Sequence, residues 1–130
     1  MKLTNTVARA AAVTAIAAGA VAMAAAPASA NSYDNWGAIA ISIDTGATAY
    51  AIDYGSAGAA ESAAVGSCGQ YDCQAVVNFA NGCGAVAQAP NGAWGWAYAA
   101  DRAGAEASAI GATPGAGARI ITWACTTGHL

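Results

Sequence analysis

The pentapeptide Trp36-Gly37-Ala38-Ile39-Ala40 returns 47 residues later as Cys83-Gly84-Ala85-Val86-Ala87. Two more pairs of segments recur in the same order, at offsets of 46 and 45 residues: 45–47 with 91–93, and 60–66 with 105–111. Because three blocks return in order at nearly equal offsets, we predict an internal repeat whose units span about residues 36–82 and 83–126.

Both units begin with a pattern typical of a β-hairpin. Large and small side chains alternate in residues 39–43 and again in 50–54, on either side of the turn-forming triplet Asp44-Thr45-Gly46. In the second unit Asn91-Gly92, a strong signal for a two-residue hairpin loop, precedes a second alternating run at 93–98.

A helix and a third strand follow in each unit. The Ala-rich segments 56–67 and 101–112 predict the helices, and the β-branched runs 75–79 and 120–123 predict the strands. Ser56 and Asp101 suit the N-cap position, and Gly66 and Gly111 are predicted to end the helices.

These elements predict an α+β fold made of two strand-strand-helix-strand repeats. One such unit cannot bury its own apolar face. We therefore expect the units to share one mainly antiparallel sheet of about six strands, with two helices packed on it.

Residues 1–30 have the pattern of a cleaved secretory signal peptide. Two basic residues are followed by an Ala- and Val-rich apolar run and by the small residues Ala28-Ser29-Ala30. The alternative, an uncleaved membrane anchor, is disfavoured because the run is mostly Ala and ends at Pro27. We expect residues 31–130 to form a single mature domain, secreted to the outside of the cell and free or associated with the cell wall.

The composition of the mature chain restricts its partners. The full sequence has a formal charge of −3, and residues 31–130 carry two Arg, no Lys and seven acidic residues, which gives −5. Such a surface repels nucleic acids and anionic lipid headgroups, so we predict a neutral or cationic partner. The same 100 residues contain only 13 Leu, Ile, Val and Phe, which predicts a need for covalent stabilisation.

All four cysteines, Cys68, Cys73, Cys83 and Cys125, lie in the mature chain. An even number in an exported protein predicts two disulfides, for which three connectivities exist. Cys68 and Cys73 can close a tight loop, so we pair them and join Cys83 to Cys125. Zinc and dithiol catalysis are disfavoured because paired two-residue spacings are missing, and we predict no metal and no cofactor.

Several distinctive segments run through the mature chain: 36–40, the helix from Ala60-Glu61 to Cys68 with Cys73 after it, 81–87, 92–96 and Trp123-Ala124-Cys125. In these segments the chain resembles the secreted bacterial family called domain of unknown function 4189. The resemblance implies secretion and disulfides, and it supplies no reaction and no catalytic residues. A second-half counterpart of the first cysteine pair, frequent in the family, is replaced here by Thr113 and Ala118.

Acidic residues are the candidates for an enzymatic alternative. Glu61 with Glu106 or Asp53 could serve a small extracellular hydrolase that uses paired carboxylates. Acids in the early turns of Ala-rich helices more commonly favour the helix dipole and solubilise the surface. His129, beside the C-terminal residue, is too loosely held for a catalytic triad, so we predict no catalytic residues.

Trp94, Trp96 and Tyr98 point to one face of a strand, and Tyr50 is the repeat counterpart of Trp96. These four residues are the candidate binding surface, since exposed rings suit stacking on sugars or contact with a protein. The alternative, which the scarcity of aliphatic residues favours, is that the rings form the core. We predict a non-catalytic extracellular module that binds a cell-wall glycan or an extracellular protein, with a secreted inhibitor or effector as a further alternative.

Overall fold

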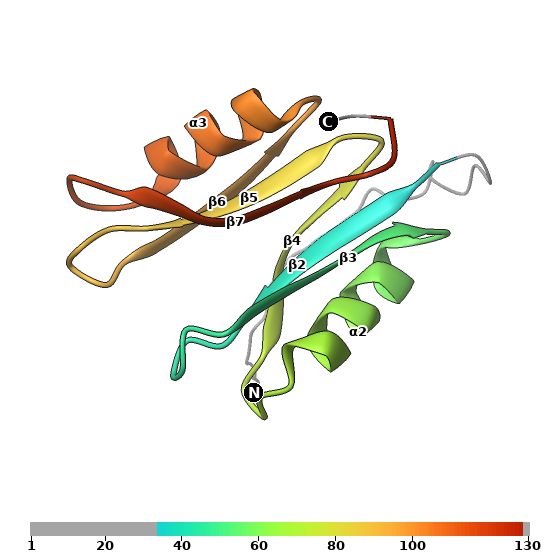
Figure 1. The fold of residues 1–130 in the computed structure, drawn as a ribbon, viewed down its shortest axis with the longest axis horizontal. Helices are drawn as coiled ribbons and strands as arrows, with labels where there is room; N and C mark the ends of the chain where they lie inside the picture. Colours follow the sequence, from blue (N-terminus) through green and yellow to red (C-terminus); the bar gives the residue numbers. More distant parts are fainter. Residues whose placement is uncertain (1–33, 129–130) are drawn as a thin grey trace, which may run out of the picture. The chain divides into compact units, whose positions relative to one another are not determined.

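The computed structural model describes residues 34–128, and six strands and two helices lie along this part of the chain (Figure 1). The elements are β2 (Trp36–Ile41), β3 (Thr48–Tyr54), α2 (Ala57–Cys68), β4 (Gln74–Ala80), β5 (Cys83–Gln88), β6 (Trp94–Ala99), α3 (Arg102–Ala112) and β7 (Arg119–Cys125). The predicted order of strand, strand, helix and strand in each half is confirmed. The predicted signal peptide lies outside the described residues. Neither described helix is long and apolar enough to cross a membrane.

The six strands form two antiparallel sheets of three strands each. The strand orders are β3-β2-β4 and β6-β5-β7, so the first strand of each half is the central strand of its own sheet. The α+β class is confirmed, whereas the single sheet of about six strands is wrong.

The link between β4 and β5 explains why the sheets are separate. The Asn81 N–H donates to the Asn35 carbonyl beside the first sheet (2.9 Å), and the Gly82 N–H donates to Thr126 Oγ1 beside the second (3.0 Å). A two-residue type I′ hairpin needs positive φ at both central residues. Asn81 has a φ of 51°, but Gly82 is not in the left-handed region. The chain therefore passes from one sheet to the other at this point.

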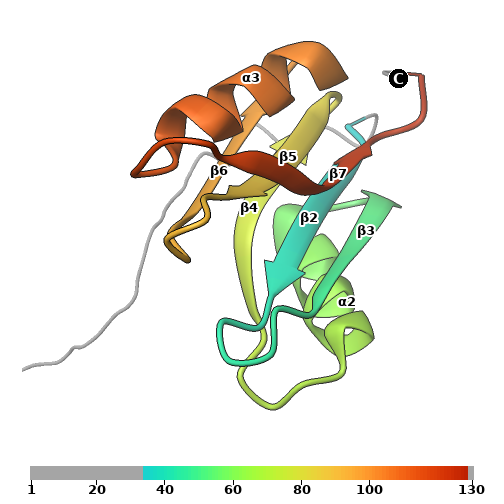
Figure 2. The same cartoon turned by 60° about the vertical axis from the view of Figure 1, so that its left-hand side comes forward.

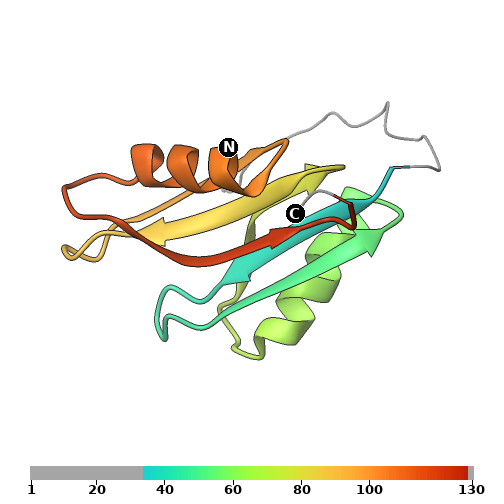
Figure 3. The ribbon, with the colours of Figure 1, turned by 45° about the horizontal axis from the view of Figure 1, so that its top comes forward.

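Small side chains join each helix to its sheet. In the first half Ala38, Ala40 and Ala51 pack against Ala60 and Ala64 of α2. In the second half the corresponding contacts join Ala85 and Ala87 to Ala105 and Ala109 of α3. Figures 2 and 3 show the two helices on the outer faces of the two sheets.

The buried Ile, Val and Phe side chains lie between the sheets. This cluster comprises Ile39, Ile41, Val77, Phe79, Val86 and Ala124, with Ile52, Val76 and Trp94 packed against it. β4 contacts β6 across the interface, β2 contacts β5, and β3 contacts β7. The described residues thus form four layers in the order helix, sheet, sheet, helix.

Phe79 fits between two glycines that occupy equivalent positions in the two halves. Gly37 is its neighbour on β2, and Gly84 lies on β5 of the other sheet. A Cβ atom at Gly84 would lie 2.5 Å from Phe79 Cε1, and one at Gly37 would also overlap the ring. Both positions therefore require Gly so that the ring can fill the interface.

The predicted helix starts are confirmed, and the observed helices end within one residue of the predicted segments, but the glycines expected to end them lie inside them. Ser56 Oγ accepts a hydrogen bond from the Ala59 N–H (3.2 Å), and Asp101 Oδ1 accepts one from the Gly104 N–H (2.7 Å). Both helices continue past the glycines predicted to end them, Gly66 and Gly111. The first helix ends at Gly69, whose φ of 76° stops the helical path.

Both predicted disulfides are present. Cys68 at the end of α2 is bonded to Cys73 just before β4. Cys83 and Cys125 face each other on β5 and β7, with their Cα atoms 4.0 Å apart, and their bond joins residues 42 positions apart in the sequence.

Candidate functional site

Trp94, Trp96 and Tyr98, together named the β6 strip, lie on the face of β6 that points toward the other sheet. Trp94 is half-buried against the inter-sheet cluster. Trp96 is 40% exposed and Tyr98 is 67% exposed. Trp94 therefore lies partly in the core, as the favoured alternative expected, whereas the rings of Trp96 and Tyr98 face solvent.

The backbone register explains why the strip lies on one face. Trp96 pairs with Val86 of β5, and Tyr98 pairs with Gly84. The opposite face of β6 presents Gly95, Ala97 and Ala99 to α3 and its C-terminal end. A Cβ at Gly95 would overlap Thr113, so this face has no room for rings.

Tyr50, the fourth residue of the candidate surface, lies apart from the β6 strip. It pairs with Ile39 and is 52% exposed. Because β3 contacts β7 and β4 contacts β6 across the interface, β3 and β6 are at opposite edges of the stacked sheets. The structure thus brings three of the four predicted aromatic residues together.

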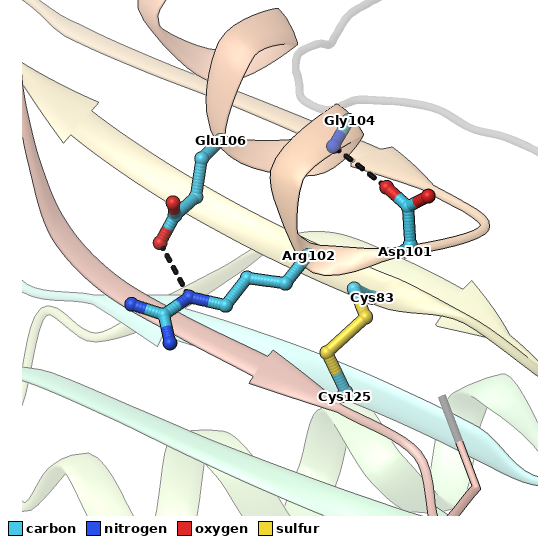
Figure 4. A network of polar contacts seen from close by, with 6 residues as sticks. All are labelled: Cys83, Asp101, Arg102, Gly104, Glu106 and Cys125. Atoms are coloured by element: carbon cyan, nitrogen blue, oxygen red, sulfur yellow. Dashed lines mark hydrogen bonds and ion pairs between the residues drawn. A yellow bond between two sulfur atoms is a disulfide. The ribbon is translucent and has the colours of Figure 1, made fainter. Parts of the chain in front are cut away.

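β6 itself carries no charged residue, and Arg102 of α3, on the outer face of the same sheet, is already paired. Arg102 Nε lies 2.9 Å from Glu106 Oε2 (Figure 4). The Arg102 guanidinium also lies 3.7 Å from the centre of the Trp123 ring. The exposed rings of the strip therefore offer flat apolar faces for contact rather than an ion-pairing site.

The symmetric pair Glu61 and Glu106 cannot act together on one substrate. Glu61 Oε2 accepts a hydrogen bond from Asn78 Nδ2 (2.6 Å) on the first half, whereas Glu106 is paired within α3. Their helices lie on opposite outer faces, with two sheets between them that stack about 10 Å apart. That separation exceeds the roughly 5–9.5 Å that paired carboxylates require. The structure therefore does not support the alternative in which this pair forms a hydrolytic site.

Asp53 is also unsuited to share acid-base work with Glu61. Its carboxylate accepts hydrogen bonds from Thr127 Oγ1 (2.5 Å) and from the Thr127 N–H (3.0 Å). These bonds lower the pKa of Asp53 from its ordinary value, so it stays ionised at neutral pH. Its partner Thr127 lies just after β7, at one edge of the stacked sheets. Glu61 instead bonds to Asn78 of β4, at the other edge.

A polar cluster that sequence reasoning missed ties the small disulfide loop to the β2–β3 turn. Asp72 accepts hydrogen bonds from Ser42 Oγ (2.6 Å) and from the Asp44 N–H (3.1 Å), and these bonds lower its pKa. The Tyr71 hydroxyl donates to Asp44 (3.1 Å), although Tyr71 is 92% exposed. The sequence feature that could have predicted this cluster is the presence of Asp44 and Asp72, each in a short segment rich in turn-forming residues.

Metal-ligating residues do not gather within residues 34–128, where no group of three or more His, Cys, Asp or Glu side chains could hold a metal ion. His129, which was excluded as a catalytic base on sequence grounds, lies outside the described residues.

The comparisons with known proteins agree with this fold. Residues 36–125 match the family described as domain of unknown function DUF4189. The chain belongs to the DUF4189 family. Among solved structures, this DUF4189 chain is similar to Rv1813c from Mycobacterium tuberculosis, determined by NMR, with 32% sequence identity and a TM-score of 0.55. The similarity covers 70% of this chain and 74% of that chain. No curated protein matches this DUF4189 chain.

Proposed function

We propose that this DUF4189 protein is a non-catalytic binding module that acts outside the cell and contacts a cell-wall glycan through Trp96 and Tyr98. The observation that carries the proposal is the exposure of these two rings. In a chain with so few large apolar residues, burial of both rings would have stabilised the fold. Their exposed position on one strand face supports a role in contact with a partner.

The chemistry of the strip suits a neutral polymer. Residues two apart on a strand lie about 6.8 Å from each other on the same face. Two flat rings at that spacing can stack on successive sugar units, whose C–H faces need no counter-charge. β6 has no charged side chain, and the net negative charge of the mature chain disfavours an anionic partner.

Export supports the same proposal. The signal-peptide pattern of residues 1–30 and the two disulfides both suit a protein that matures in an oxidising compartment at the cell surface. In this proposal residues 31–130 are the mature protein, and its two halves derive from a duplicated unit.

Binding can be measured by co-sedimentation with insoluble cell-wall glycan and by NMR titration with soluble N-acetylglucosamine oligomers, both at low micromolar protein. We expect Trp96→Ala to weaken binding about tenfold or more, because loss of a central stacking ring costs at least about 1.4 kcal/mol. Tyr98→Ala should weaken it by a smaller factor. Tyr50→Ala is the matched control, since it removes an exposed ring outside the β6 strip.

Two results would refute the proposal. One is a lack of binding to both glycan probes by the folded, oxidised protein. The other is binding that Trp96→Ala and Tyr98→Ala leave unchanged. If cross-linking instead captures a culture-fluid protein through the β6 strip, the glycan assignment is wrong and the partner is a protein.

A further inference from the structure

β6 differs from the other three edge strands because its pairing is unbroken. Val76 of β4 and Ile121 of β7 are extra residues without a partner on the central strand. β3 is also irregular, next to Asp53, whose φ is 66°. By contrast, every residue of β6 from Trp94 to Ala99 has a partner on β5 in continuous register.

Such irregularities normally protect the edges of sheets. A bulge twists an edge strand and interrupts the row of free N–H and C=O groups that another strand could use. Charged residues have the same effect, and β3 carries Asp53 while β7 carries Arg119. β6 has neither a bulge nor a charge nor a proline, and within residues 34–128 it pairs with β5 alone. It is the least protected edge of the described fold.

We propose that β6 pairs antiparallel with β6 of a second copy of this chain, about a two-fold axis normal to the sheet. The proposal involves the same strand as glycan binding but is tested separately, because pairing through the backbone edge of β6 needs no ligand. A two-fold axis joins the two three-stranded sheets into one continuous sheet and places both α3 helices on the same side.

The sequence of β6 suits pairing with itself. Residues directly opposite each other in an antiparallel pair share a face. In the register centred on Trp96, the two Trp96 rings face each other, and Trp94 of each copy faces Tyr98 of the other. All three rings then form cross-strand aromatic pairs, while Gly95 and Ala97 meet on the helix side without crowding. The strands bring no like charges together, although each mature chain carries a net charge of −5.

The expected association is weak. Aromatic side chains bury about 150–250 Å² each, and Trp96 and Tyr98 are 40% and 67% exposed, so these rings offer roughly 200 Å² per copy. With the backbone of one strand added, the interface stays below the roughly 800 Å² per partner of a stable complex. We therefore expect dissociation constants of about 0.1–1 mM.

Sedimentation equilibrium of the oxidised mature protein tests the proposal. Between about 10 µM and 1 mM protein, the average mass should rise from the monomer value toward twice that value. Tyr98→Lys, which places a charge on the strand, should weaken association at least about tenfold. Tyr50→Lys is the matched control, because it makes the same change to an exposed ring on the irregular edge strand β3, and it should leave association unchanged.

Amide hydrogen exchange of the unmodified protein provides a second measurement that needs no variant. At the highest concentration the outward-pointing amides of β6 should exchange several times more slowly than in dilute solution, while those of β3 should not change. A monomer at about 1 mM, or a dimer that Tyr98→Lys leaves intact, overturns the proposal. Unchanged exchange along β6 in a sample that does dimerise also overturns it, since the contact must then lie elsewhere.

Discussion

Substitution of Gly84 by Ala tests how the two sheets pack. The new Cβ would lie 2.5 Å from Phe79 Cε1, and the ring cannot move away toward Gly37 because it already fills that space. Overpacking of a well-filled core costs about 1–3 kcal/mol. For a domain of about 100 residues this lowers the melting temperature by roughly 5–20 °C. Gly66→Ala provides the opposite case, because nothing lies within 4 Å of its Cβ position and the helix interior favours Ala by about 0.5–1 kcal/mol.

Urea unfolding of the oxidised protein, followed by Trp fluorescence, measures both changes. We expect a lower midpoint for Gly84→Ala and a higher one for Gly66→Ala. In a Phe79→Leu background the penalty of Gly84→Ala should fall by about half or more, because the two residues are in contact and their effects are coupled. A Gly84→Ala protein as stable as the parent, or a penalty that the Phe79→Leu background leaves undiminished, would refute the packing described for Phe79.

Two further predictions concern the disulfides and pH. Replacement of Cys83 and Cys125 by Ala should lower the free energy of unfolding by about 4 kcal/mol, and replacement of Cys68 and Cys73 by about 2 kcal/mol, because the first bond closes a loop of 42 residues and the second a loop of five. Equal urea midpoints for the two double variants would contradict this loop-length reasoning. Because hydrogen bonds from Thr127 lower the pKa of Asp53 below its ordinary 3.8, they stabilise the fold above that pH and lose their effect as the pH falls through the lowered pKa. The stability difference between the parent and Asp53→Asn should therefore be present at pH 7 and shrink below about pH 4, and a pH-independent difference would show that ionisation of Asp53 is not involved.

Features that depend on a few neighbouring residues could be predicted from the sequence. Ser56 and Asp101 cap helices because each has a short oxygen-bearing side chain beside the first free N–H groups. The turn residues Gly46 and Gly92 have positive φ. The predicted two-residue loop at Asn91-Gly92 is wrong, because the Ala89 N–H donates to the Ala93 carbonyl and leaves three residues, 90–92, in the loop. The Cys68–Cys73 bond was predicted because these two cysteines are close enough in sequence to close a tight loop.

The two glycines predicted to end the helices lie inside them, for a local reason that spacing alone does not reveal. Neither Gly66 nor Gly111 has a positive φ, so neither glycine takes the backbone out of the helix. Gly69 ends α2 because it adopts a left-handed conformation just after Cys68, where the disulfide turns the chain back toward β4. A glycine inside a helix weakens it by about 1 kcal/mol without having to end it.

Sequence reasoning could predict which residues of the candidate site share a strand face, but not which of them are exposed. The period of two placed Trp94, Trp96 and Tyr98 on one face, but their exposure depends on how far β4 of the other sheet covers β6. The partners of the acids are similarly distant in sequence. Asn78 is 17 residues from Glu61, and Thr127 is 74 residues from Asp53. Such contacts arise from the packing of the two halves, which local patterns do not specify.

The sizes of the side chains explain why a single six-stranded sheet would have left one of its faces exposed to water. On each central strand, Ala alternates with Ile or Val, so one face of the sheet is shallow and the other is bulky. Helices made mostly of Ala and Gly fit the shallow faces, where Ala meets Ala. With both helices used in this way, one sheet of six strands would leave Ile39, Ile41 and Val86 open to water. Stacking the two bulky faces removes those side chains from water, at about 25 cal/mol for each Å² of apolar surface buried. The passage of the chain from one sheet to the other at Asn81-Gly82 therefore suits helices composed mostly of Ala and Gly. Larger side chains on the sheet-facing side of α2 or α3 would be expected to push the helix away from its sheet and to destabilise the fold.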